Sequence, residues 1–316
     1  MKSALKYSLV LLALGLAVVA LRQHFAELPS LMRIVDWIPL GIALVGLLIY
    51  QFWNASVWSE VLGVMGLSCR RLDSARVWLE AESLKWLPGT IWCYGSRVVT
   101  AQKLGVNKKQ ASSSIVLELI LTNIAWAILG GTIVFSGKVM IVVGPWLDQG
   151  MTFLADRWWV FVLSVMVAFP CMIFLYRTII RSKRFKQLLD IGKISYTKCL
   201  RTVCHYVLLC IWNATMMWVV FGAIPSLDIP YFTVLGVAGV AWLVGFWSIG
   251  IPGGIGVREA VIVLFLSQYA SVELSLLAAV LWRGLQMLAE IGALLVSLSI
   301  GANQHFKCKE GERGNV

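Results

Sequence analysis

The sequence has few charges and few groupings of catalytic residues. Only 14% of its 316 residues are charged, against about a quarter in a soluble domain. It has only three histidines, and none of its seven cysteines has metal-ligand spacing with one of them. There is no nucleophile elbow, Walker loop, paired histidines or Cys–His–Asp grouping. The sequence therefore predicts no metal, no cofactor and no catalytic residue.

Apolar residues, in contrast, make up 59% of the chain. They gather in segments at about 5–21, 38–58, 112–135, 158–176, 203–223, 231–250, 257–270 and 273–300. Most are close to the twenty residues that a helix needs to cross a bilayer. We expect an all-α fold, a polytopic bundle of about eight transmembrane helices. Residues 1–302 would form one membrane domain, and 303–316 a short polar tail.

Basic residues are distributed unevenly between the connections. The formal net charge is +11, and Lys and Arg concentrate in 59–111 and 177–202, which alternation places on one side. The connections on the other side hold only Arg22, Arg33, Lys138 and Arg157. This bias predicts cytoplasmic N- and C-termini. It also accounts for the charge without a nucleic-acid partner, since no contiguous basic face is indicated.

Several features of the apolar pattern allow two interpretations. Segment 257–270 is short and could be a half helix. The N-terminal run resembles a signal peptide, although the even helix count favours a retained helix. Residues 176–201 read as a surface helix, whose charge either sets the topology or contacts anionic lipid. The cysteines should be free thiols, and tryptophans near span ends, including Trp58, Trp78 and Trp282, should anchor the interface.

Helix-breaking residues interrupt the apolar stretch SIGIPGGIGVREAVIV, residues 248–263. The breaking residues are Pro252, Gly253, Gly254 and Gly256. Arg258 and Glu259 then open the next helix. Free amides at a helix start, together with Arg258, would suit an anion such as a lipid phosphate. The alternative is a tight turn at the membrane surface, with Arg258 reaching the head groups.

A second interrupted stretch, ESLKWLPGTIWCYGSRVVTAQKLG, covers residues 82–105. Pro88 and Gly89 break it between Lys85 and Arg97. The segment is too short and too charged to span, so we expect a re-entrant hairpin or an interfacial helix-turn-helix. Non-helical backbone at membrane depth needs protein or water to satisfy its hydrogen bonds. Two breaks entered from one side therefore predict a polar cavity lined by both.

Polar residues also fall inside predicted spans, namely Glu118, Asn123, Arg283, Gln286 and Glu290. A charge there costs about 3 kcal/mol, so these side chains should face the interior and pair. The spacing i, i+3, i+7 places Arg283, Gln286 and Glu290 on one helix face. We expect Glu118 or Glu290 to pair with Arg283 or Arg258, and Glu259 to pair with Lys85 or Arg97. Purely structural ion pairs are the alternative.

The two interrupted segments resemble those of the lysylphosphatidylglycerol synthase transmembrane region, also called the flippase-like domain family. Lys85, Pro88, Gly89, Trp92 and Arg97 match its first motif, and Pro252, Gly253, Gly254, Gly256, Arg258, Glu259 and Ala260 match its second. The resemblance covers about residues 1–300 and implies a bacterial inner-membrane protein. In bifunctional relatives this region moves aminoacylated phospholipid made by a soluble synthase domain. No such domain follows Ile300 here, so we expect no aminoacyl transfer.

These observations predict a lipid transporter that binds the anionic head group of a phospholipid or a lipid-linked sugar in a cationic cavity within the membrane. The residues of the two motifs would bind the head group, and the charges in the spans would support them. Partners would be membrane lipids and envelope-synthesis enzymes. The alternatives are a membrane transferase or accessory subunit in glycolipid or envelope-polysaccharide synthesis, with Glu259 or Glu118 as its carboxylate, and a structural partner of such enzymes.

Overall fold

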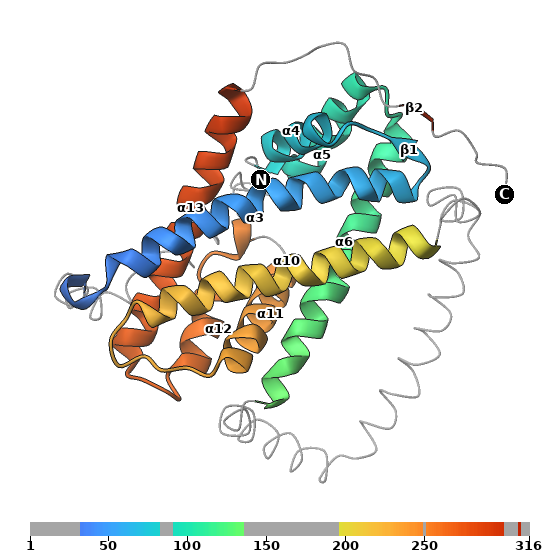
Figure 1. Cartoon of the computed structure of the whole chain (residues 1–316). Coiled ribbons are helices and arrows are strands. Elements are labelled where there is room, and N and C mark those ends of the chain that lie inside the picture. Colours follow the sequence, from blue (N-terminus) through green and yellow to red (C-terminus); the bar gives the residue numbers. More distant parts are fainter. Residues whose placement is uncertain (1–31, 83–90, 136–195, 249–250, 300–308, 311–316) are drawn as a thin grey trace, which may run out of the picture.

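The computed structural model describes residues 32–82, 91–135, 196–248, 251–299 and 309–310 (Figure 1). Helices account for 85% of these residues. The elements are η1 (Met32–Ile34), α3 (Trp37–Val64), β1 (Leu67–Ser68), α4 (Arg71–Glu82), α5 (Ile91–Ala101), η3 (Gln102–Leu104), α6 (Lys108–Gly131), η4 (Thr132–Phe135), α10 (Tyr196–Gly222), α11 (Tyr231–Trp247), η6 (Pro252–Gly254), α12 (Val257–Leu266), α13 (Val272–Ser299) and β2 (Lys309–Glu310). The described part of the chain is thus mostly helical.

Four helices are long and apolar enough to cross a membrane: Trp37–Val64, Lys108–Gly131, Thr197–Gly222 and Val272–Ser299. They coincide with four of the predicted apolar segments and indicate a membrane protein. Helix α11 is apolar but has 17 residues, and α12 has 10. The predicted segments 5–21 and 158–176 lie outside the described residues.

The long helices extend beyond their apolar segments into polar turns. Helix α3 continues through Glu60, whose carboxylate lies 3.4 Å from Arg71 Nη2 and 2.6 Å from His205 Nδ1. These contacts join the end of α3 to the starts of α4 and α10. Side-chain caps fix two helix starts: Asp36 accepts from the Ile38 amide at 3.0 Å, and Asn107 forms a capping box with Gln110.

The basic residues gather at one end of the bundle. This basic end comprises the end of α3, helices α4 and α5, the starts of α6 and α10, and the paired strands β1 and β2 (Figure 1). It carries Arg70, Arg71, Arg76, Lys103, Lys108, Lys109, Lys198, Arg201 and Lys309. At the opposite end the Asp36 amide donates to the Ala223 carbonyl at 2.9 Å, and Arg33 is the basic residue described there.

Small residues allow the helices to pack closely. Gly239 of α11 lies against Gly130 of α6, where an added Cβ would come 2.8 Å from the Trp126 carbonyl oxygen. Gly46 of α3 receives Met216 of α10 in the same way, and its carbonyl accepts from Trp212 Nε1 at 2.8 Å. Such contacts are typical of helix pairs in membranes.

Two predictions about individual side chains are wrong. Trp58, Trp78 and Trp282 are at most 4% exposed, so they belong to the core and do not anchor the interface. Cys69, next to β1, is disulfide-bonded rather than a free thiol. Cys93 and Cys210 are buried and are not disulfide-bonded.

Candidate functional site

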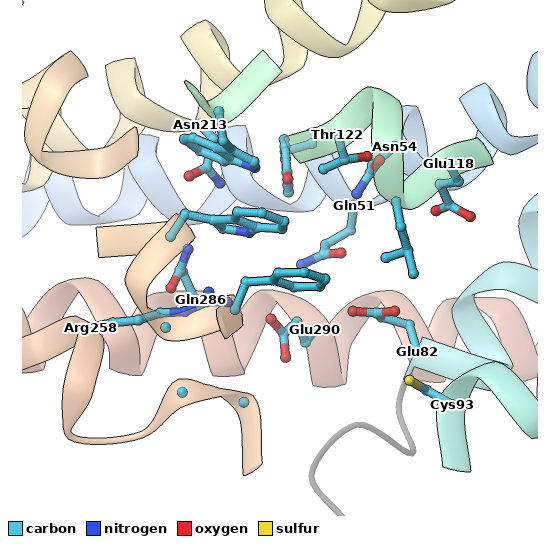
Figure 2. Close-up of a pocket in the computed structure, with 18 of the residues that line it drawn as sticks. Gln51, Asn54, Glu82, Cys93, Glu118, Thr122, Asn213, Arg258, Gln286 and Glu290 are labelled. Atoms are coloured by element: carbon cyan, nitrogen blue, oxygen red, sulfur yellow. The ribbon is translucent and has the colours of Figure 1, made fainter. Parts of the chain in front are cut away.

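A cavity of about 300 Å³ lies inside the bundle (Figure 2). Side chains from α3, α4, α5, α6, α10, α11, α12 and α13 line it, together with the backbone of η6. Its volume is at the lower end of the range of about 300–1,000 Å³ for small-molecule sites. It can hold a head group or another small polar molecule.

One charged cluster, centred on Arg97 of α5, closes one side of the cavity. Arg97 is 1% exposed; its Nη1 pairs with Glu118 of α6, and its Nη2 lies 3.5 Å from Glu82 of α4. The Trp78 indole donates to the other Glu118 oxygen at 2.7 Å. Burial disfavours the charge, but the carboxylates of Glu118 and Glu82 outweigh it and raise the pKa of Arg97. The guanidinium therefore stays charged.

Two tryptophan rings lie close to the Arg97 guanidinium. Its Cζ lies 5.8 Å from the Trp58 ring centroid and 5.2 Å from that of Trp78. A cation within about 6 Å of a ring face is attracted by the quadrupole. The predicted pairing of Glu118 with Arg283 or Arg258 is wrong, because Arg97 occupies Glu118. This cluster holds α4, α5 and α6 together.

A second charged cluster, centred on Arg283 of α13, ties α13 to the Pro-Gly-Gly break. Arg283 Nε donates to Glu259 at 2.6 Å, Nη1 donates to Gln286 at 2.9 Å, and Nη2 donates to the Gly253 carbonyl at 3.3 Å. The other Glu259 oxygen accepts from the Gly256 amide at 2.7 Å. Glu259 therefore pairs with Arg283, and its predicted pairing with Arg97 is wrong.

The break itself depends on glycine conformations. Gly253, Gly254 and Gly256 have φ values of 59°, 67° and 82°, a region that favours glycine. They reverse the chain between α11 and α12 and bring the backbone of Gly253 and Gly254 to the cavity wall. The side chain of Pro252 is not among the described ones. The first break, with Lys85, Pro88 and Gly89, lies outside the described residues, between α4 and α5.

Arg258 is set apart from the other two arginines of the cavity. It lines the cavity with its Cζ 5.7 Å from the Trp242 ring centroid. Its Nε is buried without a hydrogen-bond partner, and no ion pair or hydrogen bond joins Arg258 to another described residue. Figure 2 shows Arg258 on the opposite side of the cavity from Glu82 and Glu118. It is a cation without a carboxylate partner among the residues that the structure describes.

The charges that line the cavity balance within the described residues. Arg97, Arg258 and Arg283 face Glu82, Glu118 and Glu290. Gln286 and Glu290 share the Arg283 face of α13 and line the cavity, as their spacing predicts. The expected positive character is therefore local to Arg258.

Other predicted residues lie away from the cavity. Trp92 is 58% exposed, and Asn123 donates to its own helix at the Leu119 carbonyl, 2.8 Å away. Gly256 and Glu259 do not line the cavity. The Glu259 carboxylate accepts from the Gly256 amide and from Arg283, and so fixes the position of the Arg283 side chain. Among the described residues, no group of three or more His, Cys, Asp or Glu side chains could hold a metal ion.

Three amide side chains of the cavity were missed by the sequence reasoning. Gln51 and Asn54 come from α3 and Asn213 from α10, and no hydrogen bond joins their side chains to another described residue. Gln51 and Asn213 are only 6% and 5% exposed. The signal that could have found them is the one used for Glu118, a polar residue inside an apolar span.

A column of stacked rings was also missed. Trp126 of α6 stacks on Trp242 of α11 with centroids 5.5 Å apart, and Trp242 stacks on Phe246 at 5.1 Å. All three rings line the cavity. The i, i+4 spacing of Trp242 and Phe246 predicts a shared face of α11, but nothing in the sequence places Trp126 against it.

Within the described residues, the cavity thus combines an arginine that forms no ion pair, a column of stacked rings and amides that form no hydrogen bond to the protein. Glu118 and Glu259, the carboxylates considered for transfer chemistry, are both held by arginines. Comparison of the chain with protein-family models and with curated proteins gives no match.

Proposed function

We propose that this protein binds the polar head group of an anionic lipid in the cavity and moves the lipid between the two leaflets of a membrane. The observation that carries the proposal is Arg258, which lines the cavity and has no carboxylate partner among the described residues. A partly buried arginine without a carboxylate partner is costly, and a phosphate would satisfy it with charge-assisted hydrogen bonds.

The position of the cavity supports a lipid as the ligand. Side chains from all four candidate spans, α3, α6, α10 and α13, line it. A polar chamber between spanning helices lets a head group cross while its acyl chains stay in hydrocarbon, and interrupted helices often form such sites. The break at Gly253 and Gly254 forms part of the wall here.

We further propose eight crossings in a bacterial inner membrane, with the basic end in the cytoplasm. The concentration of Lys and Arg at that end supports this orientation. The count of eight includes the predicted segments 5–21 and 158–176 and the short helices α11 and α12. The two motifs remain the basis of the proposed membership of the flippase-like domain family.

A scrambling assay tests the proposal. The full chain is reconstituted into liposomes that carry a trace of fluorescent phosphatidylglycerol or of a fluorescent polyprenyl phosphate, and a membrane-impermeant reductant quenches the outer leaflet. Wild type should expose the inner-leaflet label of at least one lipid. Arg258→Gln should abolish that exposure, whereas Arg201→Gln, an exposed arginine at the basic end, should not. Failure of wild type with both lipids, or equal rates in Arg258→Gln, would contradict the proposal.

A further inference from the structure

Two amide side chains of the cavity form no hydrogen bond to another described residue and are available to a ligand. Gln51 and Asn213 are 6% and 5% exposed, and neither side chain is hydrogen-bonded to a described residue. Buried polar side chains in folded proteins are almost always hydrogen-bonded. An amide offers both donors and acceptors. A ligand group that can both donate and accept, such as a hydroxyl, would therefore suit these two side chains.

The amide, ring and cation features come together at one place. A smaller space of about 20 Å³ adjoins the cavity, and Trp126, Asn213, Trp242 and Arg258 line both. The smaller space holds about one water. The larger cavity is the one that can hold a ligand beside these residues. Figure 2 shows Gln51 between the Arg258 side and the Glu82 side of the cavity.

Stacked rings beside amides match the surface of a sugar. A pyranose ring presents C–H groups on its faces and hydroxyls around its edge. Aromatic rings can pack against the C–H faces of the sugar, and amide side chains can hydrogen-bond to its hydroxyls. In the column the two outer faces belong to Trp126 and Phe246, because Trp242 lies between them. A bare phosphate or a simple amine head group would use neither the rings nor Gln51.

We infer that the head group bound in this cavity is a phosphate-linked sugar. Its phosphate binds Arg258, its pyranose ring lies against the column formed by Trp126, Trp242 and Phe246, and its hydroxyls hydrogen-bond to Gln51 and Asn213. This inference rests on the proposed function and names the substrate class of the same site. It selects a glycosylated carrier lipid over a phospholipid.

Competitive binding of three lipids to the full chain in detergent, read by native mass spectrometry, tests the inference. The probes are a polyprenyl phosphate hexose, the same polyprenyl phosphate without the sugar, and phosphatidylglycerol. Wild type should bind the glycosylated lipid about tenfold more tightly than the bare polyprenyl phosphate, the difference expected from hydrogen bonds that the bare lipid leaves unmade. Phosphatidylglycerol should bind no better than the bare lipid.

Variants separate the contributions of the sugar and the phosphate. Gln51→Leu and Asn213→Leu should remove most of the preference for the sugar and retain binding of bare polyprenyl phosphate, which reports that the site is folded. Phe246→Leu should weaken the preference, whereas Phe232→Leu on the same helix should not, because Phe232 is 61% exposed and does not line the cavity. Asn123→Leu is the matched amide control, since Asn123 also lies outside the cavity.

The outcomes test the sugar assignment separately from the proposed function, which is the binding of an anionic lipid. Wild type could bind the glycosylated and the bare lipid equally, and Arg258→Gln could lose both. That result would overturn the sugar assignment but would still support the binding of an anionic lipid. A preference that survives in both Gln51→Leu and Asn213→Leu would also overturn the sugar assignment. If no phosphate-bearing probe responds to Arg258→Gln, both the sugar assignment and the proposed function fail.

Discussion

The side chain of Arg258 packs directly on the backbone of Gly245. A Cβ atom on Gly245 would lie 2.5 Å from the Arg258 Nε atom, a separation that folded proteins do not show. A Cβ atom on Gly254 would lie 3.0 Å from the same nitrogen and 3.0 Å from the Gly245 Cα. Helix α11 and the Pro-Gly-Gly break thus form a slot that holds the arginine stem beside the cavity.

Gly245→Ala should therefore displace Arg258 and reduce lipid binding as strongly as Arg258→Gln does. Overpacking of this kind also costs about 1–3 kcal/mol of stability. Native mass spectrometry with polyprenyl phosphate measures the binding. The control is Gly284→Ala on α13, which has no atom within 4 Å and should be neutral or stabilising by up to ~1 kcal/mol. Unchanged binding in Gly245→Ala would show that Arg258 does not act from this slot.

Gly254→Ala and Gly256→Ala should differ in the stability that they cost. Both glycines have positive φ, so alanine is strained at either by about 1–2 kcal/mol. Only Gly254 also lacks space, whereas Gly256 has no atom within 4 Å of an added Cβ. Thermal unfolding in detergent should show the larger loss for Gly254→Ala. Equal losses would mean that Arg258 and Gly245 make room for the added Cβ without a loss of stability.

Breaking the pair between Arg97 and Glu118 should destabilise the protein more than removing both charges. Arg97→Met leaves Glu118 buried without its cation, which costs about 3–5 kcal/mol in comparable buried pairs. Glu118→Gln in the same chain keeps an acceptor for Trp78 and should recover much of that loss. A double-mutant cycle on thermal unfolding measures the coupling. Additive losses would argue against a coupled pair.

The proposed orientation predicts which positions a membrane-impermeant maleimide reaches in intact cells. Asp228, in the exposed turn after α10, should be labelled as Asp228→Cys without permeabilisation. Lys103, exposed at the basic end, should be labelled as Lys103→Cys only after the membrane is opened. The unmodified chain gives the background from its own cysteines. The reverse pattern would place the basic end outside.

Much of the helical fold follows from the sequence because the bilayer fixes helix length. The apolar segments at 38–58 and 203–223 reappear as α3 and α10. The helix ends do not follow, because polar turns continue a helix once partners exist. Glu60 extends α3 in this way through Arg71 and His205, which lie elsewhere in the sequence.

The sequence predicted which polar side chains share a helix face in the candidate site, but it did not predict their ion-pair partners on other helices. Spacing on α13 correctly grouped Arg283, Gln286 and Glu290. The pairing of Glu118 with Arg283 or Arg258 and that of Glu259 with Arg97 were wrong. Pairing across helices depends on how each helix is rotated, and spacing along one helix does not fix this. The Trp126 contact with Trp242 depends on α6 packing closely on α11, and no local pattern encodes it.

The most direct measurement is a cryo-electron microscopy map of the full chain in nanodiscs that contain a phosphate-bearing lipid. If a phosphate-bearing lipid binds in the cavity, elongated density should enter the bundle, with its head group within hydrogen-bonding distance of Arg258. Lipid density confined to the outer surface of the bundle, with Arg258 facing only water or a carboxylate of the chain, would contradict this binding.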